Sequence, residues 1–434
     1  MRLGWVAWVG ALLAVVAFSG CRESKTDQLE YRSEAPEETA VATKDVFAGA
    51  ADGSSEGVSA GIRDYFQRLG RATRSEGEID ADAFLSVDAM LTVMDSAGIL
   101  EGMSRKEERL FREAFRKRSS VFGASLKQMA FDQHRILKVE DLGKDDRMVF
   151  VRLYDNDFNV TMQMRWWLVK TDAGWRAYDF EDLSVGIRSI SLMSIVMKSG
   201  LGGKCEPWVS DLLRLVQMMQ GIDYTDLDEV EGLRAPLKKM RGHPLPIDVK
   251  RFTSFLMVTV MQSAEEFSES LEELEAAKNG GYDSPLYHYL KGHSLMGLER
   301  YSEALVEFEK HSEVLGWDSD VLESVSDCHL HLGDTESARK AALQGLEDNP
   351  RSINCLASLV AASTPDQIRS EEVGKMFDES GQVEWAYEVA FDYLFALEQE
   401  EQAEVLFEVI KDKYPESELA EYCAAMLEDE ETEE

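Results

Sequence analysis

The residue types that usually carry catalysis or bind metals are present in this chain, but their spacing fits none of the common site patterns. Of the seven histidines, His288 and His293 are five residues apart, while His329 and His331 are two apart and would face different directions on a helix. No Gly-x-Ser-x-Gly, phosphate-loop or His-Glu-x-x-His motif occurs. The carboxylates of residues 221–228 do not follow the order of a calcium loop. We therefore expect no bound metal, no cofactor and no enzymatic activity.

The chain carries a large negative net charge, and this charge is unevenly distributed. The net charge is −36, and residues 251–434 contribute 43 acidic and 12 basic side chains, a net of −31. Phosphate groups would be repelled by this half, which excludes nucleic acid as its direct partner. A basic protein surface or divalent cations are favoured instead.

The acidic half contains an internal repeat. Related segments begin at Phe267, Tyr301 and Thr335, at a fixed interval of 34 residues. Apolar residues at helical spacing predict two helices in each unit. A later copy repeats Ala338 as Ala403, 65 residues on, so that a degenerate unit at residues 353–380 lies between them.

These units resemble the tetratricopeptide repeat family over about residues 250–426. The positions that match its helix-packing pattern are Gly292, Tyr301, Ala304, Phe308, Gly333, Ala338, Pro350, Ala403, Phe407 and Pro415. Two positions depart from the pattern, because Ser326 replaces a packing glycine and Ala342 replaces an aromatic residue. The resemblance implies a helical solenoid that binds other proteins on its concave face.

Placing the tetratricopeptide pattern on the sequence identifies candidate partner-binding residues on the inner helices. They are Tyr289, His293, Glu323, Asp327 and His331. The alternative is that the acidic members are ordinary solvated surface. Cys328 and Cys355 also fall on neighbouring inner helices, where they either form a disulfide or remain buried thiols. No Cys-x-x-Cys pair occurs, which argues against thioredoxin-like or zinc chemistry.

The N-terminal 21 residues have the features of an export signal. Arg2 precedes an apolar run at residues 3–18, and the run ends in Phe18-Ser19-Gly20-Cys21. This ending resembles the bacterial lipobox, which implies lipid attachment at Cys21 and a place in the cell envelope. Because Arg22 follows Cys21, in place of the retention aspartate, we expect the periplasmic face of the outer membrane. The alternative is an ordinary cleaved signal peptide.

Residues 58–200 change from helical to strand patterns. Helices are expected at residues 62–71, 81–94 and 105–122, with a closing helix at residues 187–197. Strands rich in β-branched and aromatic residues are expected at 131–139, 148–154, 160–169 and 175–180. The turn residues between consecutive strands predict hairpins, and so an α+β layer with an antiparallel sheet.

This order of elements resembles the cone-shaped fold of nuclear transport factor 2. The ending Trp175-Arg-Ala-Tyr178-Asp179, followed by Leu183-Ser184, is also similar to the periplasmic phospholipid carriers of the Mla system. The cone resemblance implies a pocket at Met162, Met164 and Trp166, unless these residues are simply core. For a cone-fold enzyme it would supply Asp132, His134 and Asp179 as catalytic candidates.

One basic helix opposes the acidic trend. Residues 105–118 contain seven lysines and arginines against three glutamates, with Phe111 and Phe115 in an apolar stripe. The basic face would contact anionic lipid, dock on the acidic repeats or remain solvated. Further helices at residues 208–219 and 227–240 are expected to cap the repeats.

Together these patterns predict a multidomain chain with an α+β cone-like domain followed by an all-α tetratricopeptide solenoid. The expected segments are a signal peptide at 1–20, a disordered tether at 21–57, the α+β domain at 58–200, a connector at 201–250, repeats at 251–427 and an acidic tail at 428–434. The predicted function is a membrane-anchored scaffold for protein partners. The alternative is lipid or small-ligand binding by the α+β domain.

Overall fold

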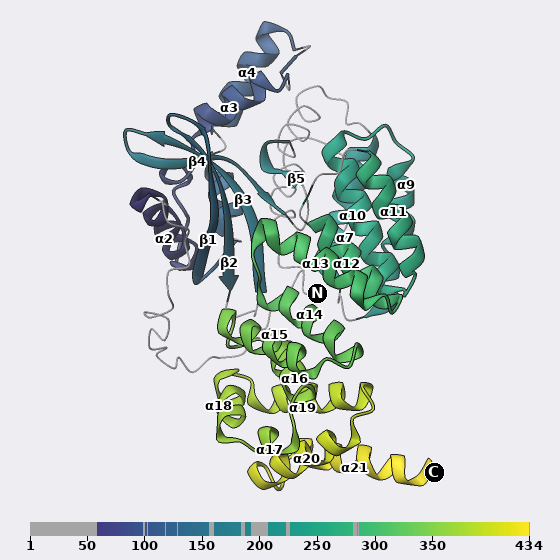
Figure 1. Ribbon diagram of the computed structural model, residues 1–434. Coiled ribbons are helices and arrows are strands. Elements are labelled where there is room, and N and C mark those ends of the chain that lie inside the picture. Colours follow the sequence, from purple (N-terminus) through teal and green to yellow (C-terminus); the bar gives the residue numbers. More distant parts are fainter. Residues whose placement is uncertain are drawn as a thin grey trace. The chain divides into compact units, whose positions relative to one another are not determined.

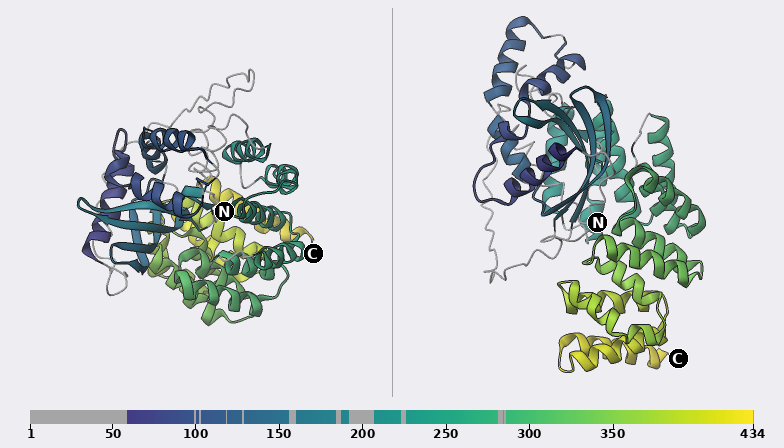
Figure 2. Two further views of the ribbon diagram at one scale, coloured as in Figure 1. Left: turned by 90° about the horizontal axis from the view of Figure 1, so that it is seen from above. Right: turned by 60° about the vertical axis from the view of Figure 1, so that its left-hand side comes forward.

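The computed structural model describes residues 59–433 except 99, 102, 118, 128, 156–159, 184–186, 192–206, 223–225, 281–283 and 285. The chain forms two compact units, Met1–Phe252 and Thr253–Glu434 (Figures 1 and 2). Cys21, the export signal, the tether and Cys205 lie outside the described residues. Within the described part of the chain, every helix is too short or too polar to span a bilayer.

The first unit combines helices with a five-stranded antiparallel sheet in the order β1-β2-β3-β4-β5. The strands are β1 (Gln133–Gly143), β2 (Asp146–Asp155), β3 (Val160–Thr171), β4 (Gly174–Asp182) and β5 (Ile187–Arg188). Four helices precede the sheet: α2 (Ala60–Arg74), α3 (Val87–Ser96), α4 (Arg105–Lys117) and α5 (Ser119–Lys127). The predicted α+β layer is confirmed.

Helix α2 provides the main apolar cover of one sheet face. Tyr65 and Phe66 are fully buried, and their rings meet Trp166 of β3 edge-on at centroid distances of 6.2 and 5.7 Å. Trp166 in turn stacks on Phe180 of β4 at 4.8 Å. Alternate residues of β3 therefore point into this aromatic core.

The prediction of a closing helix at residues 187–197 is wrong for its first two residues. Ile187 and Arg188 form strand β5, which pairs with β4. Arg188 Nε lies 2.5 Å from the buried Asp179 carboxylate, and its guanidinium lies 4.3 Å from the Trp167 ring centroid. The ion pair and the ring contact hold the segment at the sheet edge. Residues 192–197 lie outside the described residues.

Residues 189–191 after β5 are helical, and four further helices are described between residue 207 and the repeats. They are α7 (Pro207–Gly221), α8 (Leu227–Glu231), α9 (Arg234–Arg241) and α10 (Ile247–Ser263). Asp211 of α7 accepts from Lys239 of α9 at 2.6 Å, which joins the two helices. The division between the two units falls within α10.

The second unit is entirely helical in its described residues and forms a solenoid of antiparallel helix pairs (Figure 1). Its inner helices are α12 (Leu286–Gly297), α14 (Ser319–His331), α16 (Ile353–Ala361) and α19 (Val383–Ala396). The others are α11 (Phe267–Asn279), α13 (Tyr301–Leu315), α15 (Thr335–Asp348), α17 (Pro365–Ile368), α18 (Glu371–Glu379), α20 (Glu400–Lys413) and α21 (Glu418–Glu433). The predicted α solenoid is confirmed.

The repeat is visible in the turns between paired helices. Glu265, Glu299, Gly333 and Glu398 all have positive φ, at 59°, 58°, 74° and 55°, and each lies two residues before the next helix. In each turn two N–H groups reach back to the last carbonyls of the preceding helix, as when Arg300 N donates to Leu295 O and Glu299 N to Met296 O, both at 2.8 Å. This is the Schellman motif, repeated four times.

Small residues let the paired helices approach closely. Ala304, Ala338 and Ala403 are buried to 1% exposure or less. A β-carbon at Gly292 would lie 2.6 Å from the ring of Phe308. Ser326, which replaces the packing glycine in the next unit, is also buried, and its hydroxyl donates to Ala338 O at 2.9 Å.

The degenerate unit between Ala338 and Ala403 differs in its outer element. A single outer helix is replaced by the short helices α17 and α18, and Thr364 with Pro365 begins the first of them. Proline is favoured at this first helical position because its missing N–H is not needed there. The break explains why the 34-residue interval is lost at this point.

Glycine at the repeated turn position should stabilise the array. Glu299→Gly removes the strain of a left-handed glutamate and should add about 0.5–1 kcal/mol to the free energy of unfolding, whereas Gly333→Ala should lower it by about 1 kcal/mol. Glu309→Gly within α13 is the control and should be destabilising. Urea unfolding followed by circular dichroism measures all three, and a loss of stability in Glu299→Gly would contradict the assignment.

Two glycine-to-alanine changes should have opposite effects. Gly292→Ala forces its new methyl group against Phe308 and should cost about 1–3 kcal/mol of stability. Gly374→Ala on α18 meets no atom within 4 Å, so it should gain about 0.5–1 kcal/mol from helix propensity alone. Thermal unfolding tests the pair, and equal effects at both positions would show that the contact at Gly292 is unimportant.

Candidate functional site

Four of the five predicted partner-binding residues lie on the inner helices α12 and α14, where they or their neighbours make contacts from one inner helix to another. Tyr289 and His293 lie one turn apart on α12, with ring centroids 4.4 Å apart. Ser324 on α14 lies beside Glu323, and its Oγ is 3.4 Å from His293 Nε2. The α12 pair therefore adjoins the acidic residues of α14.

The two carboxylates of α14 connect to the next inner helices. Glu323 accepts a hydrogen bond from Asn354 Nδ2 of α16 at 3.2 Å. Asp327 accepts one from the hydroxyl of Tyr393 on α19, which is 66 residues further along the chain. These bonds cross from one repeat to another, so they fix the spacing of the inner helices as well as the side chains.

His331 lies at the edge of these contacts, beside Asp327 and Tyr301. Its ring stacks on Tyr301 at the start of α13, with centroids 4.5 Å apart and planes 2° from parallel. Its Nε2 is 3.9 Å from Asp327 Oδ1. His331 therefore belongs to the end of the repeat that carries the helix–helix turns.

Burial changes the titration of two residues in the network. It lowers the pKa of His293 to about 4, so this ring is neutral at pH 7. Burial and the neighbouring Asp320 raise the pKa of Glu323 to about 7. The negative charge of Glu323 is thus costly in the free protein and would be stabilised by an approaching cation.

A second pair of acidic residues, on α19, was not predicted from the sequence. The 65-residue interval that relates Ala338 to Ala403 also relates Glu323 to Glu388 and Asp327 to Asp392. Glu388 and Asp392 are exposed, and Asp392 accepts from the Tyr422 hydroxyl of α21 at 2.8 Å. Applying the interval to the candidate residues, as well as to the packing residues, would have found them.

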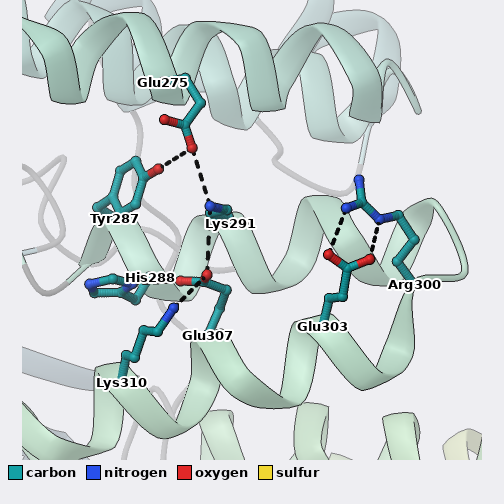
Figure 3. A network of polar contacts seen from close by, with 8 residues as sticks. All are labelled: Glu275, Tyr287, His288, Lys291, Arg300, Glu303, Glu307 and Lys310. Carbon is teal, nitrogen blue, oxygen red and sulfur yellow. Dashed lines mark hydrogen bonds and ion pairs between the residues drawn. The ribbon is translucent and has the colours of Figure 1, made fainter.

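A second polar network lies between α11, α12 and α13 (Figure 3). Lys291 lies 3.1 Å from Glu275 and 3.6 Å from Glu307, and Tyr287 donates to Glu275 at 2.6 Å. Glu307 is buried and also contacts His288 Nδ1 at 2.6 Å. A cavity of about 390 Å³ borders this network. Because its charges are mutually paired, the network is suited to joining repeats.

The proposed pocket of the first unit lies in the packed core. Trp166 is fully buried, Met164 is 2% exposed, and Met162 is half-buried opposite Leu153. The Trp166 ring is surrounded by the aromatic side chains of α2 and β4. The aromatic side chains of α2 and β4 therefore occupy the space beside Trp166.

The structure does not bring the three cone-fold catalytic candidates together. Asp132 pairs with Arg74 at 2.9 Å, while His134 packs against Phe66, and burial lowers its pKa to about 4. Asp179 points from the opposite sheet face, where it accepts from Arg188, Ser189 and Ile190. These contacts give Asp179 a structural part in holding β5.

The cysteines and the basic helix α4 are the remaining features that the sequence singled out. Cys328, Cys355 and Cys423 are buried free thiols, which resolves the open question about Cys328 and Cys355. In α4, Phe111 and Phe115 are buried, while the basic side chains remain at the surface and Arg116 pairs with Asp88 at 2.9 Å.

The fold and the inner-face network define a chain with an α+β domain followed by an all-helical solenoid. No protein-family model matches the chain, and no curated protein matches its sequence. A solved structure titled "Functional Characterization of Pseudomonas Aeruginosa pilF" is similar at a TM-score of 0.34 and 16% identity. The similarity covers 51% of this chain and 100% of that one. A TM-score of this size supports no inference about this chain.

The raised pKa of Glu323 predicts a loss of stability as the pH rises. Between about pH 4.5 and 7 the unfolded chain releases this proton while the folded protein retains it, so the free energy of unfolding should fall. Glu323→Gln should remove this part of the decrease. Urea unfolding at pH 5 and pH 8 measures it, with Glu309→Gln as the exposed control. An unchanged pH dependence in Glu323→Gln would contradict the assignment.

Proposed function

We propose that this protein is a membrane-anchored bacterial lipoprotein that acts as a scaffold for protein partners, using its helical array as a tetratricopeptide-type binding surface. The observation that carries the proposal is the repeated Schellman turn, which recurs at the sequence interval of the predicted repeats. A repeated turn places equivalent positions of successive inner helices on one face. That face carries Tyr289, His293, Glu323 and Asp327.

The charge of the array favours a basic partner. With a net charge of −31 over residues 251–434, the array attracts cationic polypeptides and repels nucleic acid. The inner helices are already held to one another by the hydrogen bonds of Glu323 and Asp327. A preformed surface of this kind loses little conformational entropy when it binds.

The remaining parts of the proposal come from the sequence. Lipid attachment at Cys21 would place the protein at the envelope, with the periplasmic face of the outer membrane as its site. Residues 22–57 would act as a tether, with a random-coil span of roughly 30–35 Å. The first unit, proposed as a cone-like domain, would lie between the tether and the array along the chain.

Neutralising the acidic pair of α14 tests the proposed function. Glu323→Gln with Asp327→Asn retains the shapes and acceptor oxygens of both side chains while removing two charges. We expect partner recovery by crosslinking in native cells to fall about tenfold, because charge pairs at interfaces are often worth 1–3 kcal/mol. The recovered proteins are identified and quantified by mass spectrometry.

The matched control is Glu309→Gln with Glu313→Gln on the outer helix α13. Both glutamates are exposed and four residues apart, so the control makes an equal change in charge at the same spacing. Recovery should be retained in this control. If the two double variants recovered equal amounts of every partner, the inner face would not be the binding surface.

A further inference from the structure

Helix α19 has two apolar stripes, and the array core covers the second of them only in part. The core stripe consists of Ala386, Tyr387, Ala390, Phe391 and Leu394, all buried to 1% exposure or less. The second stripe follows the adjacent helical row through Trp385, Val389 and Tyr393. Trp385 is 44% exposed, and the other two are half-buried. A helix that only supported the solenoid would need one apolar face.

A row of carboxylates runs beside this second stripe. Glu384, Glu388 and Asp392 are spaced every four residues on α19, and all three are exposed. The Tyr422 hydroxyl fixes Asp392 from α21. Lys413 on the neighbouring helix α20 is 2.5 Å from Asp378, so its charge is already paired.

The exposed tryptophan also borders a cleft. The cleft has a volume of about 430 Å³, and its lining is Gln382, Val383, Glu384, Trp385 and Tyr414. It is therefore formed at the start of α19, with Tyr414 contributed from the end of α20. Trp385 and Glu384 therefore both line this shallow, open cleft.

We propose that the Trp385 stripe and its flanking carboxylates bind a segment of a partner protein that carries both apolar and basic side chains, as on one face of a basic amphipathic helix. This proposal rests on the proposed scaffold function and names the partner chemistry at the C-terminal end of the inner face. Apolar side chains of the partner cover Val389 and the indole of Trp385. Its lysines or arginines lie over the indole face and pair with Glu388 and Asp392.

Charge complementarity selects this occupant over other polypeptides. An acidic helix would be repelled by three carboxylates within two turns, and a purely polar cationic segment would leave the indole uncovered. Aromatic anchors at the centre of an interface commonly contribute most of its binding energy. Trp385 and the carboxylate row together therefore favour a partner segment that has both apolar and basic side chains.

The test uses the full-length protein and a defined probe. The probe is a fluorescent 18-residue helical peptide of leucine and lysine, with the leucines three and four residues apart. Fluorescence anisotropy measures its dissociation constant. Trp385→Ala and, separately, Glu388→Gln with Asp392→Asn should each raise the dissociation constant about tenfold or more. Incorporated 5-fluorotryptophan should show the ¹⁹F resonance of Trp385 shifting on titration, and Trp385→Phe assigns that resonance.

Matched controls separate the site from general attraction to an acidic protein. Glu371→Gln with Glu372→Gln removes two charges from α18, and Leu332→Ala removes a side chain that is 47% exposed elsewhere. Both controls should change the dissociation constant less than twofold. A peptide with serine in place of leucine should bind at least about tenfold more weakly if the apolar stripe is used. Because Trp385 is exposed, its replacement should leave the far-ultraviolet circular dichroism unchanged.

The outcomes distinguish this proposal from the proposed function. If Glu323→Gln with Asp327→Asn weakens probe binding and the α19 variants do not, the inner face binds but the Trp385 site is overturned. If every variant binds equally and salt abolishes binding, the attraction is nonspecific and the Trp385 site is again overturned. Loss of binding in the α19 variants alone supports the site, even if partner capture in cells does not depend on α14.

Discussion

The left-handed turn between paired helices is the constraint on which the second unit depends. Each Schellman motif ends one helix, and the next helix starts two residues after the left-handed residue, with the same hydrogen bonds at residues 265, 299, 333 and 398. In the next unit the position of Gly292 is taken by Ser326, which is also buried and donates its hydroxyl to Ala338 O. The phase of the inner helices then decides which residues share a face. The composition of the inner face is thus a consequence of turn geometry.

The array must also accommodate its many carboxylates, and it does so differently around Glu307 and on the inner face. Around Glu307, carboxylates are matched by Lys291 and Lys310, so their burial is compensated. On the inner face, Glu323 accepts a hydrogen bond from Asn354 and forms no ion pair within the described part of the chain, and burial raises its pKa. Placing uncompensated charge on the inner face is consistent with a binding role.

The sequence predicted the elements well where periodicity is strong. The interval of 34 residues located the starts of α11, α13 and α15, and the alternation of β-branched and aromatic residues located the strands of the sheet. It could not show that Arg188 would pair with Asp179 and extend the sheet, because that contact joins two segments through a buried ion pair. Nor could alternation decide whether Trp166 would face a pocket or the aromatic side chains of α2. The acidic positions of α19 were missed because the broken outer element of the preceding unit interrupts the repeat.

The proposed binding face also differs along its length in the existing contacts that a partner would have to displace. Asp327 is already engaged by Tyr393, and a partner contacting it must either displace that hydroxyl or add to it. Trp385 differs from Asp327, because much of its ring faces solvent and is available to be covered by a partner. Covering apolar surface gains about 25 cal/mol for each Å² removed from water, without the loss of an existing hydrogen bond. The α19 end should therefore supply most of the affinity, and the hydrogen-bonded α14 end should act mainly through charge.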